Sequence, residues 1–182
     1  TPLETGYLLR IGIDHFKEIN DNFGQEYGDF VLKKTAECIS GCTSEGQKVY
    51  KLVADEFLIL DVASDEAKDA DKLYDKVREA IDRFIETNEF KVMYTVSGGI
   101  VPFAALKGNQ CSEALKLTDF ALNEAKKLGR NRCYIFNGET YRKFLRKREI
   151  TQELREAVLN GCQGFTAFYQ PVFAEDKKVP YG

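Results

Sequence analysis

The stretch KLVADEFLIL, residues 51–60, places two neighbouring carboxylates, Asp55 and Glu56, between two apolar runs. Both runs have the composition of β-strands, so the stretch predicts a hairpin with acidic side chains at its tip. Paired carboxylates at such a tip are typical of a metal-dependent site. The turn itself holds Val53 and Ala54, whereas a tight hairpin favours glycine or asparagine at these places.

Outward from this hairpin, apolar periodicity predicts an alternation of strands and helices. Strands are expected over residues 6–13, 49–54, 57–62, 93–103 and 132–136, with Gly98 and Gly99 interrupting the fourth. Two helices are expected over 15–24 and 27–40. A third is expected to begin after an N-terminal cap at Ser64, and a fourth to run from a cap at Ser112 to a stop at Gly129. Their inward positions are predicted to be Phe30, Leu32, Ala36 and Ile39, then Ala70, Leu73, Val77, Ile81 and Phe84, then Leu117, Phe120, Ala121 and Leu128.

The resulting order is β-α-α-β-β-α-β-α-β, in which hairpins are mixed with helical crossovers. This order predicts an α/β (α+β) fold with a mixed sheet and packed helices, of ferredoxin-like or palm-like type.

The character of the chain changes after residue 137. Residues 138–160 are helical in pattern and strongly charged, and residues 164–173 form an aromatic run interrupted by Pro171 that we interpret as a strand. We therefore expect one domain over 1–137, connecting helices over 138–160 and the start of a second, truncated domain over 161–182. The chain begins with Thr1, so we expect it to be a piece of a longer protein.

Composition excludes several classes of function. A net charge of -3 gives no reason to expect nucleic acid or an anionic membrane as partner. No apolar run approaches the ~20 residues that span a bilayer. Five cysteines without a C-x-x-C pair indicate reduced thiols in the cytoplasm and no zinc site. His15 is the single histidine, and we do not expect it to bind a metal.

Four ordered blocks carry a family resemblance: IGIDHFKEINDNFGQEYGDFVL (11–32), ADEF (54–57), YTVSGGI (94–100) and EAKKLGRNRCYIF (124–136). Together they resemble the GGDEF domain family, the diguanylate cyclases, over roughly residues 7–137, which implies a nucleotidyl cyclase-type fold. The tail from LREAVLNGCQGFTAFYQPVF (154–173) to VPYG (179–182) resembles the opening of an EAL domain, the cyclic di-GMP phosphodiesterase family. The catalytic EAL residues would then lie outside this chain.

The resemblance implies a phosphoryl chemistry that relies on metal ions and positioning, in which two GTP molecules are joined into cyclic di-GMP by a homodimer of domains meeting face to face. Mg²⁺ would be held by two carboxylate positions, which are Gly12 and Asp55 here. Glycine has no side-chain oxygen. Asp14 is the alternative ligand if the strand stays regular, although its reach differs by about 6.5 Å along the strand. Glu56 matches the residue that the family keeps near the reacting hydroxyl.

The residues that contact the nucleotide in the family have matching residue types in this sequence. Asn20 and Asp29 match the pair that reads guanine, and an amide with a carboxylate suits the polar edge of that base. Lys126 and Arg130 match the phosphate contacts.

The inhibitory site of the family, R-x-x-D, falls on Ser44 and Gln47 here. Neither residue is charged, so we do not expect product to bind there.

Two departures from the family favour loss of cyclisation. Gly12 has no side chain to act as a metal ligand, and Val53–Ala54 replaces two glycines. A valine forced to positive φ would be strained by on the order of 1–3 kcal/mol; otherwise the turn changes shape, or its side chains intrude on the GTP site. The sequence thus predicts a catalytically impaired module that binds a guanine nucleotide, or only docks, and controls an attached EAL phosphodiesterase. A weakly active diguanylate cyclase and a structural dimerisation module without nucleotide are the alternatives.

Each candidate residue also has an ordinary structural explanation. Asp55 and Glu56 could form a solvated turn. Asn20 and Asp29 could be helix-end residues, and Lys126 with Arg130 could be cations favoured at a helix C-terminus.

Overall fold

The computed structural model describes residues 5–62, 64, 67–87, 92–106 and 111–171. The chain divides into two compact units, Thr1–Tyr141 and Arg142–Gly182.

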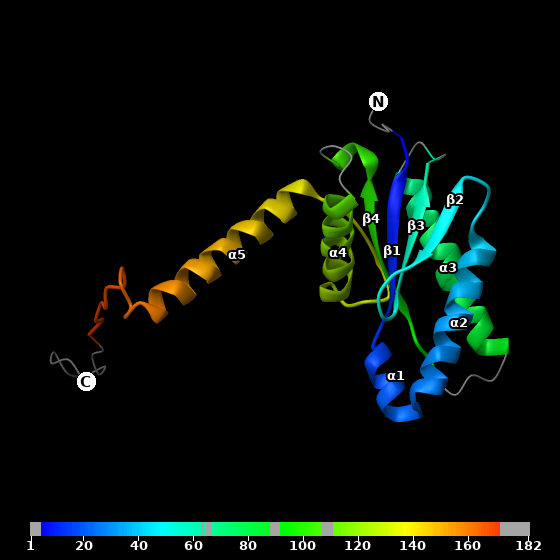
Figure 1. Cartoon of the computed structure of the whole chain (residues 1–182), viewed down its shortest axis with the longest axis horizontal. Helices are drawn as coiled ribbons and strands as arrows, with labels where there is room; N and C mark the ends of the chain where they lie inside the picture. Colours follow the sequence, from blue (N-terminus) through cyan, green and yellow to red (C-terminus); the bar gives the residue numbers. More distant parts are fainter. Residues whose placement is uncertain (1–4, 63, 65–66, 88–91, 107–110, 172–182) are drawn as a thin grey trace, which may run out of the picture. The chain divides into compact units, whose positions relative to one another are not determined.

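The first unit holds a five-stranded sheet in the order β2-β3-β1-β4-β5 (Figure 1). The strands are β1 (Tyr7–Ile13), β2 (Gln47–Lys51), β3 (Glu56–Asp61), β4 (Val96–Pro102) and β5 (Cys133–Ile135). The helices are α1 (Phe16–Phe23), α2 (Gln25–Cys42), α3 (Ala67–Thr87), α4 (Cys111–Lys127) and the short 3₁₀ turn η1 (Phe103–Ala105). Only the β4–β5 pair is parallel among these strands, so the sheet is mixed and the predicted fold class is confirmed.

Strand β1 lies at the centre of the sheet and sorts its side chains between two layers. Its odd-numbered residues, Tyr7, Leu9, Ile11 and Ile13, are buried in the core beneath α2 and α3. The even-numbered Leu8 packs in the second core, which α4 covers with Leu117 and Ala121. Figure 1 shows α4 on one side of the sheet and α2 with α3 on the other. This division follows from the period of two along a strand.

The helical periodicity identified most of the inward positions. Ile39, Ala70, Leu73, Val77, Ile81, Leu117, Phe120 and Ala121 are buried as predicted, and Leu32 and Ala36 pack partly buried against the core. Three expectations were wrong. Phe30 is 42% exposed, Ile85 rather than Phe84 is the buried residue of the last turn of α3, and Leu128 is 55% exposed. Leu128 falls outside because α4 ends at Lys127.

Gly98 and Gly99 do not interrupt a strand, which corrects the expectation from the sequence. Both lie within β4, which begins at Val96 rather than at residue 93. A Cβ on Gly99 would lie 2.3 Å from the backbone nitrogen of Leu122, so glycine here allows α4 to approach the sheet closely.

Of the two predicted serine caps, the one at Ser112 was wrong. Ser112 lies inside α4, which begins at Cys111. The Ser64 hydroxyl donates to Asp61 Oδ2 at 2.8 Å, and residues 65–66, between Ser64 and α3, lie outside the described residues.

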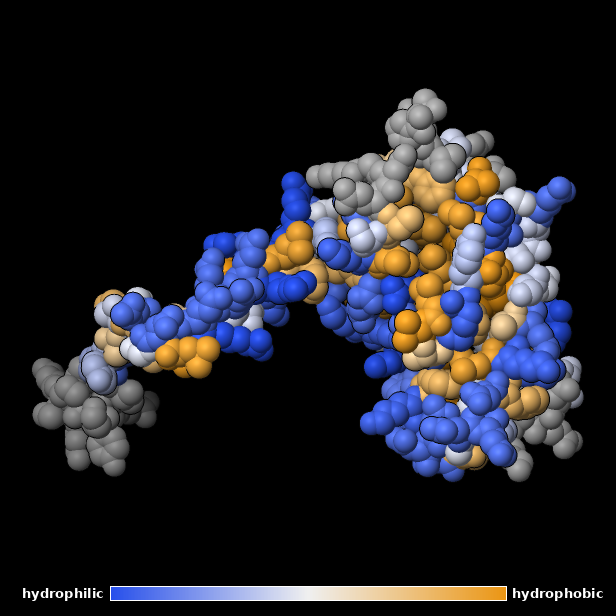
Figure 2. Space-filling model, in the orientation of Figure 1, coloured by the Kyte–Doolittle hydropathy of each residue, from blue (hydrophilic) through white to orange (hydrophobic). Residues whose placement is uncertain are grey.

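The helix α5 (Gly138–Leu159) confirms the predicted helical segment after residue 137. Asn137 caps it, because its Oδ1 accepts from the backbone N–H of Glu139 and of Thr140, both at 3.0 Å. Figure 2 shows a largely hydrophilic α5 surface with scattered hydrophobic residues. None of the helices in the described ranges is both long and apolar enough to cross a membrane.

A strand was predicted over the aromatic run 164–173. Residues 164–171 do not form a strand, and residues 172–173 lie outside the described residues. A single strand needs a neighbour to satisfy its backbone, and the described residues provide none for this segment.

A pair of glycine substitutions tests the close packing of α4 on β4. Gly99→Ala should lower the free energy of unfolding by about 1–3 kcal/mol, because the new methyl group meets backbone that cannot yield. Gly41→Ala is the control: its Cβ would have no neighbour within 4 Å in α2, so stability should rise by up to about 1 kcal/mol. Equal effects of the two substitutions in urea unfolding would contradict this packing.

Candidate functional site

The candidate site begins on the face of β1 that is turned toward α4. Gly12 is buried there and pairs with Glu56 of β3 on one side and with Ser97 of β4 on the other. Arg10 precedes it by two residues and therefore shares its face. The end of β1 thus meets the acidic hairpin, as the sequence predicted.

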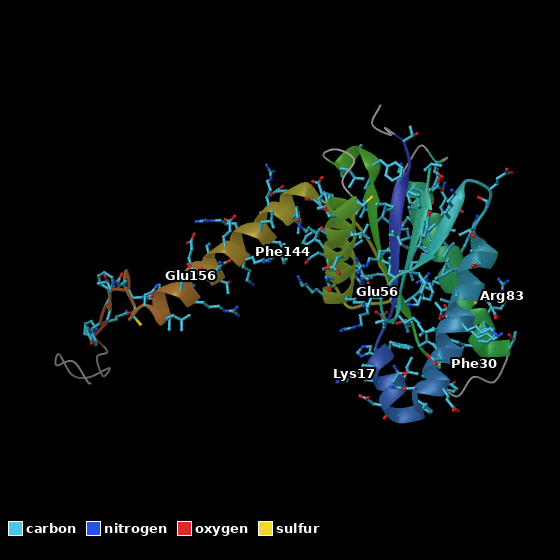
Figure 3. The ribbon with its side chains drawn as sticks, viewed as in Figure 1. Lys17, Phe30, Glu56, Arg83, Phe144 and Glu156 are labelled. Atoms are coloured by element: carbon cyan, nitrogen blue, oxygen red, sulfur yellow. The ribbon has the colours of Figure 1, made fainter. Side chains whose placement is uncertain are left out.

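The hairpin was predicted to carry both carboxylates at its tip, and the structure places them differently. Glu56 is the first residue of β3 and only 20% of its side chain is exposed. Asp55 is the last residue of the loop and is half-buried; its carbonyl accepts from the backbone N–H of Ile13 at 3.3 Å. Glu56, labelled in Figure 3, lies at the end of the sheet where β1 leads into α1.

The turn avoids the strain expected at Val53. Ala54 has a φ of 54°, while Val53 is not at positive φ and its side chain is 84% exposed. The ammonium of Lys51 donates to the carbonyls of Leu52, at 3.1 Å, and of Ala54. Burial lowers the pKa of Lys51, and the nearby carboxylates of the loop oppose that shift. Of the two residues that replace the glycines, only Ala54 occupies the left-handed region.

Arg10 ties the acidic hairpin to α4. Its Nε donates to Glu56 Oε2 at 2.7 Å, an Nη atom donates to the carbonyl of Leu115 at 3.3 Å, and the guanidinium lies 3.4 Å from Asp119 Oδ1. Only 14% of the Arg10 side chain is exposed. The sequence reasoning missed this residue, although a single charge inside the apolar run LLRIGI was a usable signal.

Lys126 lies over Gly12. A Cβ built on Gly12 would be 3.1 Å from Lys126 Nζ and 3.2 Å from a methyl group of Leu122. The side chain is half-buried at the end of α4, and its ammonium forms no hydrogen bond or ion pair with any described residue. The predicted phosphate residue thus occupies the space where a carboxylate at position 12 would project.

Arg130 lies in the loop after α4 with a φ of 61° and an exposed side chain. Its backbone N–H donates to the carbonyl of Ala125 at 3.2 Å, so the loop stays next to the helix end that carries Lys126. The structure therefore brings the two predicted phosphate contacts to one helix terminus.

Asp14 has a structural role that the prediction of a metal ligand did not anticipate. It is buried, and it accepts hydrogen bonds from Thr95 Oγ1 and Ser97 Oγ, both at 2.7 Å, and from the backbone N–H of Asn131 at 3.1 Å. These donors lie toward β4, whereas Asp55 lies on the β3 side of β1. The structure therefore does not bring Asp14 and Asp55 together as a ligand pair.

Asn20 and Asp29 come from neighbouring helices. A Cβ on Gly28 of α2 would lie 1.8 Å from Asn20 Oδ1 and 3.3 Å from the ring of Phe16 in α1. The Asn20 amide therefore packs directly against the residue before Asp29, whose side chain is exposed. The two predicted guanine contacts lie at one junction, between α1 and α2.

Ser44 and Gln47, the positions of the family's inhibitory site, bond to each other. Gln47 Oε1 accepts from the backbone N–H of Ser44 at 2.9 Å, and Gln47 Nε2 donates to Asp61 Oδ2 at 2.6 Å.

A cleft of about 660 Å³ lies between α1, the end of α3 and the residues before β4. His15 lines it, with its Nδ1 2.6 Å from Glu18 Oε1. Asp14 and Asn131 line this cleft, whereas Asp55 and Glu56 do not.

The side chains around Asp55 fit a divalent cation poorly. Mg²⁺ favours oxygen ligands in octahedral arrangement, yet Gly12 has no side chain, Asp14 accepts three hydrogen bonds from other residues and Glu56 is paired with Arg10. Across the described ranges, no group of three or more His, Cys, Asp or Glu residues is placed to hold a metal ion.

A mixed sheet with this strand order and an acidic hairpin beside the end of β1 defines a nucleotidyl cyclase-type domain. The family model "Diguanylate cyclase, GGDEF domain" matches residues 3–132, and the chain belongs to the GGDEF family of cyclic di-GMP signalling domains.

Named relatives and solved structures agree with this membership. Diguanylate cyclase A of Treponema denticola is 30% identical over 71% of this chain and 34% of its own length. The cyclic di-GMP phosphodiesterase NbdA of Pseudomonas aeruginosa is 29% identical over 92% of this chain and 21% of its own. The active GGEEF domain of a Vibrio cholerae diguanylate cyclase superposes with a TM-score of 0.61 at 28% identity, covering 72% of this chain and 83% of that one. The chain spans between 21% and 42% of the length of the first three curated relatives.

Replacing Asp14 tests its role as the anchor of the loop after α4. Asp14→Ala leaves two hydroxyls and one backbone N–H without their acceptor, so the free energy of unfolding should fall by about 2–4 kcal/mol. Asp21→Ala, at an exposed position of α1, should change it by less than about 0.5 kcal/mol. Indistinguishable denaturation curves for the two variants would show that the Asp14 contacts carry no stability.

Proposed function

We propose that this chain is a catalytically impaired GGDEF domain that binds a guanine nucleotide and regulates an attached EAL phosphodiesterase. The observation that carries the proposal is the contrast within one site. Groups suited to guanine and phosphate are kept, whereas Gly12 stands at a metal-ligand position and Glu56 is paired with Arg10.

Impairment follows from what phosphoryl transfer requires. Such reactions depend on metal ions that neutralise phosphate charge and on accurate positioning. One carboxylate, Asp55, remains for a metal such as Mg²⁺. Glu56 would have to leave the guanidinium of Arg10, 2.7 Å away, before it could act near a reacting hydroxyl.

Nucleotide binding rests on two groups of side chains. The Asn20 amide and the Asp29 carboxylate offer the acceptors that the N1–H and N2 donors of guanine need. Lys126 and Arg130 supply positive charge for the phosphates at the end of α4.

The reach of the alignments supports an attached phosphodiesterase. NbdA and the bifunctional diguanylate cyclase/cyclic di-GMP phosphodiesterase MucR, both of Pseudomonas aeruginosa, align over 92% and 83% of this chain. The relatives named only as diguanylate cyclases align over 69% to 72%. The longer alignments include residues beyond the family match, which ends at residue 132. We infer a GGDEF domain over 1–137, a connecting helix over 138–160 and the start of an EAL domain over 161–182, in a cytoplasmic protein.

A weakly active diguanylate cyclase is the second candidate. It is favoured by the presence of Asp55 and Glu56 and by the number of relatives named as diguanylate cyclases. That activity would require two copies to meet face to face, each with one GTP. A structural dimerisation module would bind no nucleotide, so GTP titration separates it from both.

Calorimetric titration tests the proposed function. GTP should bind at least about tenfold more tightly than ATP, with a Kd between about ten micromolar and one millimolar, because a site with fixed polar partners rejects a base that leaves them unpaired. Asp29→Ala should abolish this preference, whereas Asp21→Ala on the exposed face of α1 should keep it. Arg130→Ala should weaken GTP more than guanosine. Equal heats for GTP and ATP, or no heat with either, would contradict nucleotide recognition.

Incubation with GTP and either Mg²⁺ or Mn²⁺ separates the first two candidates. We expect no cyclic di-GMP by chromatography, since a second metal-binding carboxylate is missing at Gly12. A product peak that disappears in Glu56→Ala would establish the weak cyclase instead.

A further inference from the structure

Two cationic side chains lie at the end of β1, where a metal site would need oxygen ligands. Lys126 lies over Gly12, and Arg10 holds Glu56. Building on the proposed function, we propose that Lys126 replaces the divalent cation, so that this domain binds the triphosphate of its nucleotide without a metal. Gly12 permits this replacement because it leaves the Lys126 ammonium without a neighbouring carboxylate.

The state of Lys126 points to an anionic ligand. Its ammonium is half-buried and has neither an ion-pair nor a hydrogen-bond partner among the described residues. By contrast, the ammonium of the next residue, Lys127, lies 2.6 Å from Glu124 Oε1. A partly desolvated cation lacking a counter-charge is satisfied by a phosphate oxygen, and such charge-assisted contacts are among the stronger hydrogen bonds in proteins.

Gly12 determines whether this ammonium is available. A side chain at position 12 would begin 3.1 Å from Lys126 Nζ, so the oxygens of a carboxylate there would lie within ion-pair distance. The carboxylate would neutralise Lys126 and also supply a metal ligand. Glycine removes both effects at once: the charge of Lys126 stays free, and no carboxylate at position 12 repels a phosphate oxygen that approaches the ammonium.

Arg10 lowers the negative charge at this strand end. It neutralises Glu56 and also approaches Asp119, 3.4 Å from its guanidinium. Glu56 therefore repels an incoming phosphate less than a free carboxylate would, and it is not available to bind a metal. Asp55 is then the remaining hairpin carboxylate, and a single carboxylate attracts Mg²⁺ weakly because that ion gives up its water reluctantly.

The proposal predicts the sign of the metal effect. Mg²⁺ on GTP cancels part of the phosphate charge that Lys126 attracts, so the wild-type chain should bind GTP in EDTA at least as tightly as in excess Mg²⁺. Gly12→Asp should reverse this order: binding in EDTA should weaken by at least about tenfold, and Mg²⁺ should restore it. Gly12→Ala adds a methyl group without a charge and should keep the wild-type order.

Two lysine variants at one helix end provide the matched comparison. Lys126→Gln should weaken GTP binding in EDTA by at least about tenfold, the effect of one lost charge-assisted contact. Lys127→Gln should leave binding unchanged, since its ammonium is already paired and 60% of the side chain is exposed. Inorganic triphosphate, titrated in the same buffers, should show the same dependence on Lys126 without any guanine contact.

The outcomes distinguish this inference from the proposed function. GTP binding that requires Mg²⁺ in the wild-type chain, or that is unaffected by Lys126→Gln, would overturn the replacement of the metal while leaving nucleotide recognition intact. Absence of GTP binding in both buffers would overturn both. Thermal unfolding identifies a variant that does not fold; if Gly12→Asp fails this check, Lys126→Gln and Gly12→Ala decide.

Discussion

Strand β1 pairs with β3 along one edge and with β4 along the other. Its side chains alternate between the layer of α2 and α3 and the layer of α4. Because Ile11 and Ile13 point into the core under α2 and α3, Arg10 and Gly12 must face α4. A register shift of one residue would turn Arg10 into the core under α2 and α3 and turn Ile11 and Ile13 toward α4. The same pairing sets Gly12 opposite Glu56, so the position of the acidic hairpin depends on it.

The charges at the end of this strand are arranged differently on its two sides. Toward β4, the carboxylate of Asp14 is enclosed by three donors and holds the loop that carries Arg130. Toward β3, Glu56 is held by Arg10. Above the strand, Lys126 has no described partner. Two of the available carboxylates are therefore committed to protein contacts, and the free charge at the centre is positive.

Much of the fold could be predicted because it depends on local periodicity. The hairpin and most of the faces of α3 and α4 follow from alternation and helical spacing, whereas the placement of Gly12 beside the hairpin was implied by the family resemblance. The contacts of Arg10 could not be predicted this way, since its partners Glu56 and Leu115 are 46 and 105 residues away. The direction of Asp14 depends on where β1 ends, and the shape of the turn at Ala54 depends on the carbonyl contacts of Lys51. Single-residue strand ends and turn geometry are decided by tertiary contacts that a periodic pattern does not contain.

A crystal structure of the protein grown with GTP and excess Mn²⁺, with an anomalous difference map, tests the central claim most directly. We expect a phosphate oxygen within hydrogen-bond distance of Lys126 Nζ, Glu56 still paired with Arg10, and no manganese peak between Asp55 and Gly12. A manganese ion bound by Asp55 and the phosphates, with Lys126 displaced from Gly12, would contradict the replacement of the metal by the lysine.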